Sequence, residues 1–505
     1  MHQAGQMLQA MSVYDQVLLT EPGNFGANHL KGVACFQLKQ YSQALSFIEK
    51  AIEINPQAPA PYSNLGLVLH ELARYEEALA SFDRALAINA NYAEAYSNRA
   101  NALLRLDRPQ QAIASYEIAI ALNPGNPVTF YNLGTAQQEC LMLEEALVSY
   151  GHAIALNPRY AQALNNRGNV FKGLGHVKQA ISDFECAIDI QSNYASAYVN
   201  KAHAHLLNGD YEFGWNCYQW RWRKDDQSIV GRTFSKPLWL GKEDIAGKTV
   251  LLHAEQGLGD TIQFCRYAKS VSDLGAKVLL EAPATLMGLL QDLPGIGALV
   301  EQGGPLPNFD CHCPLLSLPL AFNTRVESIP FSEAYLSSNS KKLQSWKNRL
   351  GEKTGFRVGL VWSGNPAHLG DKTRSLRLSD LLEYLPRGIE YVSLQKEVRE
   401  ADLAALHGSG VLHFGSDLQD FSDTAALCDL MDLVVCVDTS VAHLSAAMGK
   451  PTWILLPFTP DWRWLLDRDD SPWYSSVKLY RQKARGDHSS ALLRVAADLG
   501  TLTEL

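Results

Sequence analysis

Five asparagines recur at an interval of 34 residues, and this spacing constrains the fold more than any other feature of the chain. They are Asn64, Asn98, Asn132, Asn166 and Asn200. Glycine or alanine follows two residues after each asparagine, and two alanine columns with an aromatic residue between them keep the same period. Small residues let two helices cross closely, and the aromatic side chain fills the space beside them. The pattern predicts stacked helix–turn–helix units, an architecture that serves as a binding surface.

The repeat frame extends on both sides of the asparagines. Five full units are predicted over 25–58, 59–92, 93–126, 127–160 and 161–194. Upstream, Ala10, Tyr14 and Pro22 fit only the second helix of an earlier unit, as expected for a capping helix or a truncated start. Downstream, a degenerate unit begins at about 195.

An aromatic segment follows the degenerate unit, GDYEFGWNCYQWRWRK at 209–224. Trp215, Tyr218 and Trp222 share one helical face. We expect this face to close the solenoid and to dock the next domain. An aromatic ligand cage and a contact in a homo-oligomer are the alternatives.

The composition restricts the classes of partner. Lys and Arg number 44 against 53 Asp and Glu, a net charge of −9, which argues against broad binding to nucleic acid. Nine cysteines are scattered without a zinc pattern, as is usual in a reducing cytoplasm. The first residues lack the features of a signal peptide, and no apolar run reaches the ~18 residues of a transmembrane helix. A cytoplasmic location is therefore expected.

After about residue 225 the hydrophobic pattern changes. Apolar runs lie at 248–255, 276–283, 356–364, 389–396, 432–440 and 451–457. They alternate with helical segments, which predicts parallel sheets covered on both faces. A polar stretch at 337–355, interpreted as irregular, divides the runs into two groups. A final helix at about 488–501 is expected to pack back across both lobes.

The predicted architecture is an all-α repeat solenoid followed by an α/β, two-lobed, Rossmann-like domain. The solenoid covers 1–225 and a linker covers 226–247. The two lobes cover 248–345 and 346–505.

The first junction with chemical potential is HAEQGLGDTIQF at 253–264. Gly257 and Gly259 allow a tight turn and a close backbone approach, and Asp260 follows at the start of a helix. The Asp260 carboxylate either caps that helix or acts as a general base for an acceptor nucleophile. Because a carboxylate repels a diphosphate, we expect the anionic donor to bind the other lobe.

The second junction is VDTSVAHLSAAMGKP at 437–451. Asp438 closes a strand, Thr439 and Ser440 start a helix, and His443 lies one turn further on the same face. Free backbone amides, two hydroxyls and the positive helix end suit a pyrophosphate, and His443 can donate a hydrogen bond to a phosphate oxygen. The alternative is an ordinary capped helix with a packed histidine.

A third segment is the polar loop WSGNPAHLGDKTRSL at 362–376. Its donors and acceptors are Asn365, His368, Asp371, Lys372 and Arg374. The loop is either simply solvated, or it lies at the mouth of a cleft where Lys372 or Arg374 neutralises a leaving diphosphate. Ser363, Gln395 and Lys396, at strand ends, complete the predicted nucleotide-binding set.

These motifs resemble known families. The 34-residue units resemble the tetratricopeptide repeat. GLGDT (257–261) and DTSVAH (438–443) are similar to the heptosyltransferase-type glycosyltransferases, which have a two-lobed GT-B fold. The combination resembles bacterial repeat-containing glycosyltransferases and, more distantly, the repeat-bearing O-linked N-acetylglucosamine transferase.

The resemblance implies roles for individual residues. Asp260 matches the proposed base of the heptosyltransferases, and Asp438, Thr439, Ser440 and His443 match their nucleotide-phosphate loop. The segments 364–375 and 457–474 look like the repeat-fused subgroup. In the O-linked N-acetylglucosamine transferase a comparable asparagine column holds an extended peptide, because an amide offers both a donor and an acceptor to a peptide backbone. Hydrogen bonding between repeats is the alternative role for the column.

The sequence therefore predicts a cytoplasmic glycosyltransferase that moves a sugar from a nucleotide-sugar donor to a protein or peptide held by the repeats. It predicts no cofactor and no obligatory metal, because a helix end and basic side chains neutralise the diphosphate. The alternatives are a non-catalytic repeat scaffold with a degenerate nucleotide-binding domain, and a transferase that acts on a glycan or lipopolysaccharide.

Overall fold

The computed structural model describes residues 7–223, 234–331, 333–368 and 370–503. The other positions include the first six residues, the last residue of the aromatic segment and the start of the predicted linker, so those predictions lie outside the described residues. Two compact units divide the chain, Met1–Tyr194 and Ala195–Leu505.

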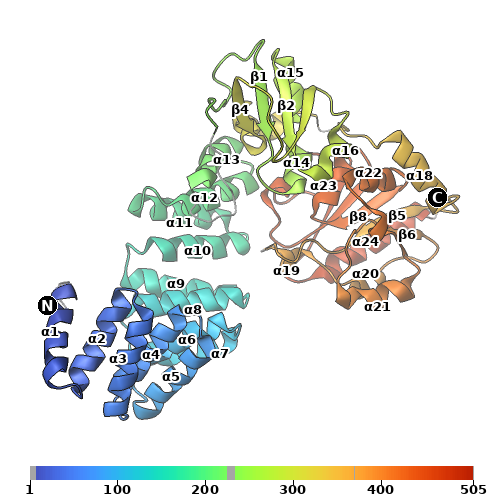
Figure 1. Cartoon of the computed structure of the whole chain (residues 1–505). Coiled ribbons are helices and arrows are strands. Elements are labelled where there is room, and N and C mark those ends of the chain that lie inside the picture. Colours follow the sequence, from blue (N-terminus) through green and yellow to red (C-terminus); the bar gives the residue numbers. More distant parts are fainter. Residues whose placement is uncertain (1–6, 224–233, 332, 369, 504–505) are drawn as a thin grey trace. The chain divides into compact units, whose positions relative to one another are not determined.

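The first unit is a series of antiparallel helix pairs (Figure 1). Helix α1 (Met7–Thr20) precedes five pairs. The pairs are α2 (Phe25–Gln37) with α3 (Tyr41–Ile54), α4 (Pro59–Glu71) with α5 (Tyr75–Ile88), α6 (Ala93–Arg105) with α7 (Pro109–Leu122), α8 (Pro127–Glu139) with α9 (Leu143–Leu156), and α10 (Ala161–Gly173) with α11 (Val177–Ile190). The predicted repeat solenoid is confirmed, including the lone helix before the first full unit.

Where the small-residue column holds glycine, it leaves room for a side chain of the second helix of the pair. A Cβ atom on Gly66 would lie 2.6 Å from the ring of Phe82, and one on Gly168 would lie 2.6 Å from that of Phe184. Both rings are fully buried. The 34-residue period is thus a packing requirement, since each aromatic ring fills the space left by a missing side chain.

The second unit begins with the last helix pair, α12 (Ala195–Leu207) and α13 (Tyr211–Tyr218), followed by the 3₁₀ turn η2 (Gln219–Arg223). Here the structure differs from the predicted boundary at 225. The indole of Trp215 donates to the carbonyl of Thr324 at 3.0 Å, and Tyr218 is hydrogen-bonded to Gln256. The aromatic face therefore docks onto the α/β part of the same chain, as predicted, and Trp215 and Tyr218 are buried there rather than free for a ligand cage or an oligomer contact.

The first lobe is a four-stranded parallel sheet in the order β3-β2-β1-β4. Its strands are β1 (Thr249–His253), β2 (Lys277–Ala282), β3 (Ile296–Glu301) and β4 (Cys311–Pro314). Helices α14 (Leu258–Phe264) and α15 (Tyr267–Asp273) connect β1 to β2, α16 (Met287–Leu290) connects β2 to β3, and α17 (Leu318–Ala321) follows β4. Two of the strands, β3 and β4, do not appear in the predicted set.

The second lobe is a six-stranded parallel sheet in the order β10-β9-β8-β5-β6-β7. Its strands are β5 (Arg357–Val361), β6 (Glu390–Ser393), β7 (Leu412–His413), β8 (Leu433–Val437), β9 (Thr452–Leu456) and β10 (Val477–Arg481). Its helices include α18 (Ser340–Leu350), α19 (Asp371–Arg374), α20 (Leu378–Leu382), α21 (Glu400–Ser409), α22 (Phe421–Asp429), α23 (Ser440–Ala447) and α24 (His488–Thr503). The two-lobed α/β domain is confirmed, and all six predicted apolar runs form strands.

Two further expectations need correction. The polar stretch at 337–355 is not irregular, because it contains helix α18, which Asn339 caps and which buries Trp346 against α22. The predicted lobe boundary at 345/346 falls inside this helix. Helix α24 forms as expected, but its buried residues, among them Leu492 and Val495, lie in the core of the second lobe instead of crossing both lobes.

Candidate functional site

Both predicted junctions lie at topological switch points of their sheets. In the first lobe β1 lies between β2 and β4, so the loop after it, which leads to α14, opens at the position where the chain direction across the sheet reverses. In the second lobe β5 lies between β8 and β6, and the loops after β5 and β8 meet there. Ligands of open α/β sheets bind at such positions, beyond the carboxyl ends of the strands.

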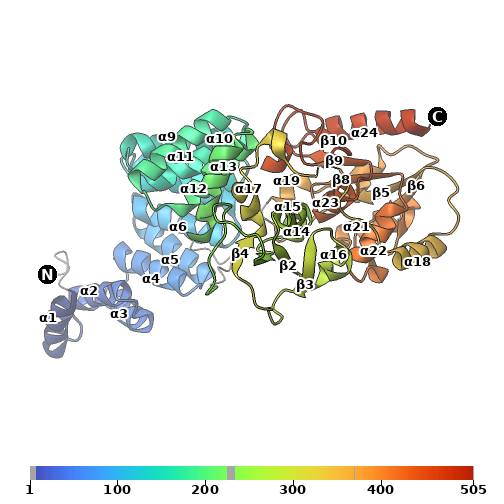
Figure 2. The same ribbon diagram turned by 90° about the horizontal axis from the view of Figure 1, so that it is seen from above.

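The two junctions are in contact. Helices α14 and α23 lie side by side in both views (Figures 1 and 2) and pack against each other. A Cβ atom on Gly259 would lie 2.9 Å from Cδ2 of His443, so only glycine fits there without displacing the ring. The fold thus brings the GLGDT and DTSVAH motifs together, although about 180 residues separate them in the sequence.

Asp260 lies at this contact with both carboxylate oxygens engaged. Its Oδ2 accepts a hydrogen bond from the backbone amide of Gly257 at 2.9 Å, and its Oδ1 is paired with the guanidinium of Arg463. The side chain keeps 17% of its surface exposed. Burial raises the pKa of Asp260, and Arg463 opposes that effect. The carboxylate therefore caps its own helix and keeps part of its surface open to solvent, and its role as a general base stays a prediction.

Arg463 is the main residue that the sequence analysis missed. It lies in the 3₁₀ turn η7 (Trp462–Trp464) of the second lobe and is buried. Its Nε donates to Gln263 at 2.6 Å and its Nη1 to Asp461 at 2.7 Å. The one available signal was an arginine between two tryptophans in the segment 457–474, which by itself indicates packing as readily as function.

The start of α23 holds the second set of predicted residues. Burial, with the nearby Asp461 carboxylate, raises the pKa of Asp438 to about 6. Arg374 donates to the backbone carbonyl of Asp438 at 2.8 Å. Within the described parts of the chain, Oγ1 of Thr439 is buried without a hydrogen-bond partner, and Ser440 follows as the first helical residue. The Thr439 hydroxyl, the backbone amides at the start of α23 and the Arg374 guanidinium therefore lie near one another.

His443 is more enclosed than the sequence suggests. Its Nδ1 is hydrogen-bonded to the hydroxyl of Tyr474 at 2.9 Å, and its ring stacks on Trp464 with centroids 5.3 Å apart. Its Nε2 lies 4.0 Å from Oδ1 of Asp438. Burial, aided by Arg463, lowers the pKa of His443 to about 3, so the ring is neutral at physiological pH. Only Nε2 is left for a phosphate oxygen, and that role stays a prediction.

The predicted residues of the loop at 362–376 differ in burial. Asp371 is buried, accepts from Ser375 at 2.7 Å and pairs with Arg399, so it organises the loop. Asn365, His368 and Lys372 are exposed. Of these, His368 lies within electrostatic range of Asp260 and Asp461.

Gln395 joins the ends of β5 and β6 through its side-chain amide. Its amide oxygen accepts from the backbone of Trp362 at 2.7 Å and Ser363 at 2.9 Å, and its amide nitrogen donates to the Ser363 hydroxyl at 3.1 Å. Lys396 is exposed and reaches the carbonyl of Gln419 at 3.4 Å. These residues have structural partners, and a ligand would have to displace them.

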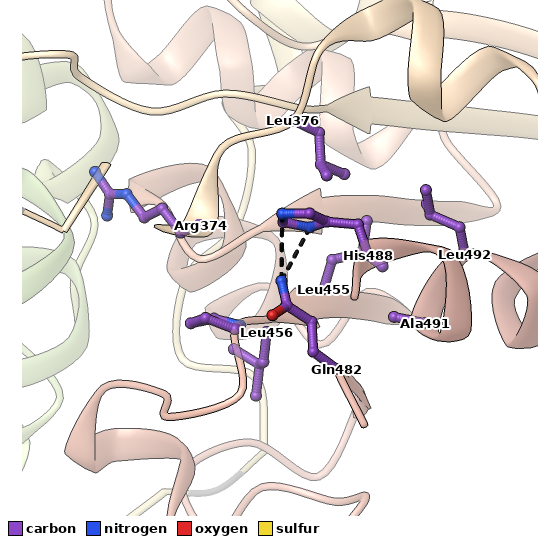
Figure 3. A pocket seen from close by; sticks show the side chains of 9 residues that line it. Arg374, Leu376, Leu455, Leu456, Gln482, His488, Ala491 and Leu492 are labelled. Atoms are coloured by element: carbon purple, nitrogen blue, oxygen red, sulfur yellow. Dashed lines mark hydrogen bonds between the residues drawn. The ribbon is translucent and has the colours of Figure 1, made fainter. Parts of the chain in front are cut away.

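A small hollow lies beside the junction, beyond the carboxyl ends of β9 and β10 (Figure 3). Apolar side chains line most of it, and the polar pair Gln482 and His488 closes one side with a hydrogen bond of 3.0 Å. The aliphatic part of Arg374 lines the hollow, while its guanidinium points away from that pair (Figure 3).

The asparagine column shows contacts between repeats. Asn64 is hydrogen-bonded to His29 at 2.8 Å, Asn132 donates to Asn101 at 3.4 Å, and Asn166 donates to Tyr131 at 3.2 Å. In each case the partner belongs to the preceding repeat. Asn98 has no side-chain hydrogen bond within the described ranges, and all five asparagines are half-buried. Both roles considered for the column are therefore open to test.

The described residues contain no group of three or more His, Cys, Asp or Glu side chains placed to hold a metal ion. No described helix is both long and apolar enough to cross a membrane.

Known families match segments in both halves of the chain. Tetratricopeptide repeat families match residues 1–66, 69–107, 93–126, 143–175 and 161–194. The family "Glycosyltransferase family 9 (heptosyltransferase)" matches residues 419–470, which include Asp438, His443 and Arg463 but not Asp260. The chain thus carries tetratricopeptide repeats before a segment that indicates glycosyl transfer.

Individual relatives are distant. Protein FlbA of Caulobacter vibrioides is 25% identical over 327 residues, which are 59% of this chain and 54% of FlbA. The chain therefore spans about half the length of that relative. Among solved structures, the tetratricopeptide protein YrrB, described as having an unusual peptide-binding site, is 22% identical and covers 36% of this chain and 95% of its own, with a TM-score of 0.32. PilF of Pseudomonas aeruginosa is 17% identical and covers 42% and 90%, with a TM-score of 0.35.

Proposed function

We propose that this protein is a GT-B-type glycosyltransferase that transfers a sugar from a nucleotide-sugar to a protein side chain held by the repeats. The observation that carries the proposal is the contact between α14 and α23, which places Asp260 opposite the helix start at Asp438–His443. The second of these motifs lies in the segment matched by glycosyltransferase family 9.

In the proposed reaction Asp260 takes the proton from the acceptor group. The acceptor oxygen or nitrogen then bonds to the anomeric carbon of the sugar as the bond between that carbon and the diphosphate oxygen breaks. The nucleoside diphosphate leaves with the electron pair of the broken bond. Three features suit its negative charge: the helical amides at Thr439–Val441, the Arg374 guanidinium, and the Thr439 hydroxyl, which has no partner among the described residues. No obligatory metal and no cofactor are proposed, because these groups supply the neutralisation.

The repeats supply the acceptor surface in this proposal, and the location is cytoplasmic. All nine cysteines are free thiols, which suits a reducing compartment.

The test combines binding and turnover. UDP, GDP, ADP, CMP and their sugar conjugates are added to the full chain, with thermal unfolding and nucleotide release as readouts. A ligand at a hundred times its Kd stabilises the folded state by about 2.7 kcal/mol. We expect one nucleotide to raise the unfolding temperature, and Thr439→Val to weaken that shift. Asp260→Asn should abolish sugar transfer but retain the shift with the nucleotide.

A non-catalytic scaffold is the second candidate, and one observation favours it: both oxygens of Asp260 already have partners. Nucleotide binding without any release from a sugar conjugate would support the scaffold. Transfer to a glycan but to no protein would instead support the glycan acceptor.

A further inference from the structure

The guanidinium of Arg463 connects the two lobes at the carboxylate of Asp260. Arg463 belongs to η7 in the second lobe, whereas Asp260 and Gln263 both belong to α14 in the first. Two of its nitrogens are used across this boundary, Nη2 on Asp260 and Nε on Gln263 at 2.6 Å. The carboxylate therefore takes its orientation partly from the opposite lobe.

The position of Arg463 is itself fixed. Its Nη1 donates to Asp461 at 2.7 Å, and the same carboxylate oxygen accepts from the Arg463 backbone amide at 3.0 Å. The guanidinium also lies over the ring of Trp462 at 4.2 Å. With only 8% of the residue exposed, the planar group has little freedom to turn, so it can hold a carboxylate in one place.

We propose that Arg463 is a positioning residue for Asp260, delivered by the second lobe to orient the carboxylate and keep it ionised for proton removal. This inference rests on the proposed function, because it assigns Asp260 the role of base. In this proposal the reaction depends on the contact between η7 and α14.

The electrostatic surroundings of Asp260 agree with this role. Five groups face it. They are Arg463 from η7, Asp461 at the N-cap of η7, His368 from the loop after β5, Tyr218 from α13 and Glu255 from the loop before α14. Burial raises the pKa of the Asp260 carboxyl, and Asp461 raises it further, whereas Arg463 lowers it. Removal of Arg463 should therefore raise that pKa and leave the base protonated over a wider range of pH.

The experiment compares Arg463→Gln, Arg463→Lys and a matched control in the full chain. The control is Arg468→Gln, which removes an arginine from the same segment that pairs with Asp470 on its own lobe. The readouts are kcat/KM as a function of pH, nucleotide binding, and rescue by added guanidinium ion. Tryptophan fluorescence reports the folding of the second unit (Ala195–Leu505), because all ten tryptophans lie after Tyr194.

Arg463→Gln should lower kcat/KM on the order of 100-fold through misplacement of the base. It should also move the acid limb of the profile to higher pH, and guanidinium should restore part of the activity. Arg463→Lys keeps the charge without the fork, so it should lose activity while the acid limb stays in place. Arg468→Gln should match the wild type.

An unchanged pH profile in Arg463→Gln together with no rescue would overturn the inference while the proposed function stands. If Arg463→Gln fails to fold, Arg463→Lys provides the test. A kcat/KM equal to that of the wild type in Arg463→Lys would also overturn the inference. Absence of transfer by the wild type would instead overturn the proposed function. The ionisation of Asp260 would then be followed by an infrared titration against Asp260→Asn, and an identical titration in Arg463→Lys and Arg463→Gln would reject the role of Arg463.

Discussion

Arg221, in the turn η2 that follows α12 and α13, forms a buried ion pair with Glu255 on the loop after β1. Two hydrogen bonds of 2.8 and 3.0 Å join the groups, whose side chains are 1% and 2% exposed. Glu255 also accepts from the backbone amide of Leu316 at 3.1 Å. The segment at 219–223 is therefore part of the α/β unit, and it holds the loop that leads to Asp260.

Replacing Arg221 with Met should destabilise this unit by about 3–5 kcal/mol, because Glu255 would be left buried without its counterion. Denaturant unfolding followed by tryptophan fluorescence measures the change. The double variant Arg221→Met/Glu255→Leu should recover most of the loss, since an apolar pair replaces a buried ion pair at little cost.

The matched control is Arg325→Met, which breaks an ion pair with Glu212 whose partners are 67% and 69% exposed. It should change stability by less than ~1 kcal/mol. Equal effects of the Arg221 and Arg325 variants would contradict the assignment of residues 219–223 to this unit.

Gly259→Ala tests the close approach of α14 and α23. The added Cβ would lie 2.9 Å from Cδ2 of His443, a ring held between Trp464 and Tyr474 that cannot easily move. Overpacking of this kind costs about 1–3 kcal/mol, partly offset by up to ~1 kcal/mol of better helix propensity. The free energy of unfolding should therefore fall.

The control for that prediction is Gly408→Ala in α21. A Cβ at Gly408 meets no atom within 4 Å, so this variant should raise stability by up to ~1 kcal/mol. The prediction fails if the two alanine variants change stability in the same direction.

The repeats and the two strand–helix motifs could be predicted from the sequence for a physical reason. The 34-residue period could be recognised because each packing position, such as Gly66 against Phe82, recurs in every repeat. The Asp260 and Asp438 motifs could be located because each directly follows a continuously buried strand, and parallel strands present their carboxyl ends at one edge. Those two inferences needed only local patterns.

The residues that were missed depend on contacts remote in sequence. Arg463 meets Asp260 across 203 positions, and no spacing rule connects them. Helix α18 was missed because its exposed face is almost entirely polar and Trp346 is its one buried residue. The partners of Gln395 could not be foreseen either, because Trp362 and Ser363 directly follow β5, more than 30 positions earlier in the chain; its role in nucleotide binding stays a prediction.

Asn98→Ala separates the two roles of the asparagine column. Asn98 has no side-chain hydrogen bond in the described part of the chain, so its loss should leave stability unchanged or raise it by about 0.5 kcal/mol through helix propensity. If the repeats hold an acceptor backbone, transfer to protein should nevertheless weaken. Circular dichroism melting and transfer to the same acceptor are the two measurements.

The comparison variant is Asn166→Ala, which removes the 3.2 Å hydrogen bond to Tyr131 in the preceding repeat. It should lower stability by about 1 kcal/mol. Undiminished transfer by Asn98→Ala would leave the column with its structural role alone.

His443→Asn should make the second unit less sensitive to acid. In the folded chain burial lowers the pKa of His443 to about 3, whereas an unfolded histidine titrates near 6.5. As the pH falls below ~6.5 the unfolded chain binds a proton that the folded chain refuses, so stability is lost with decreasing pH. At pH 5 the difference of about 1.5 pH units corresponds to about 2 kcal/mol. Between pH 7 and pH 5 the wild type should therefore lose about 2 kcal/mol more unfolding free energy than His443→Asn, as measured by tryptophan fluorescence. His152 is exposed, so the control variant His152→Asn should behave as the wild type. An equal acid response in all three proteins would show that the ring becomes charged within the folded structure, and it would remove the neutral histidine from the proposed site.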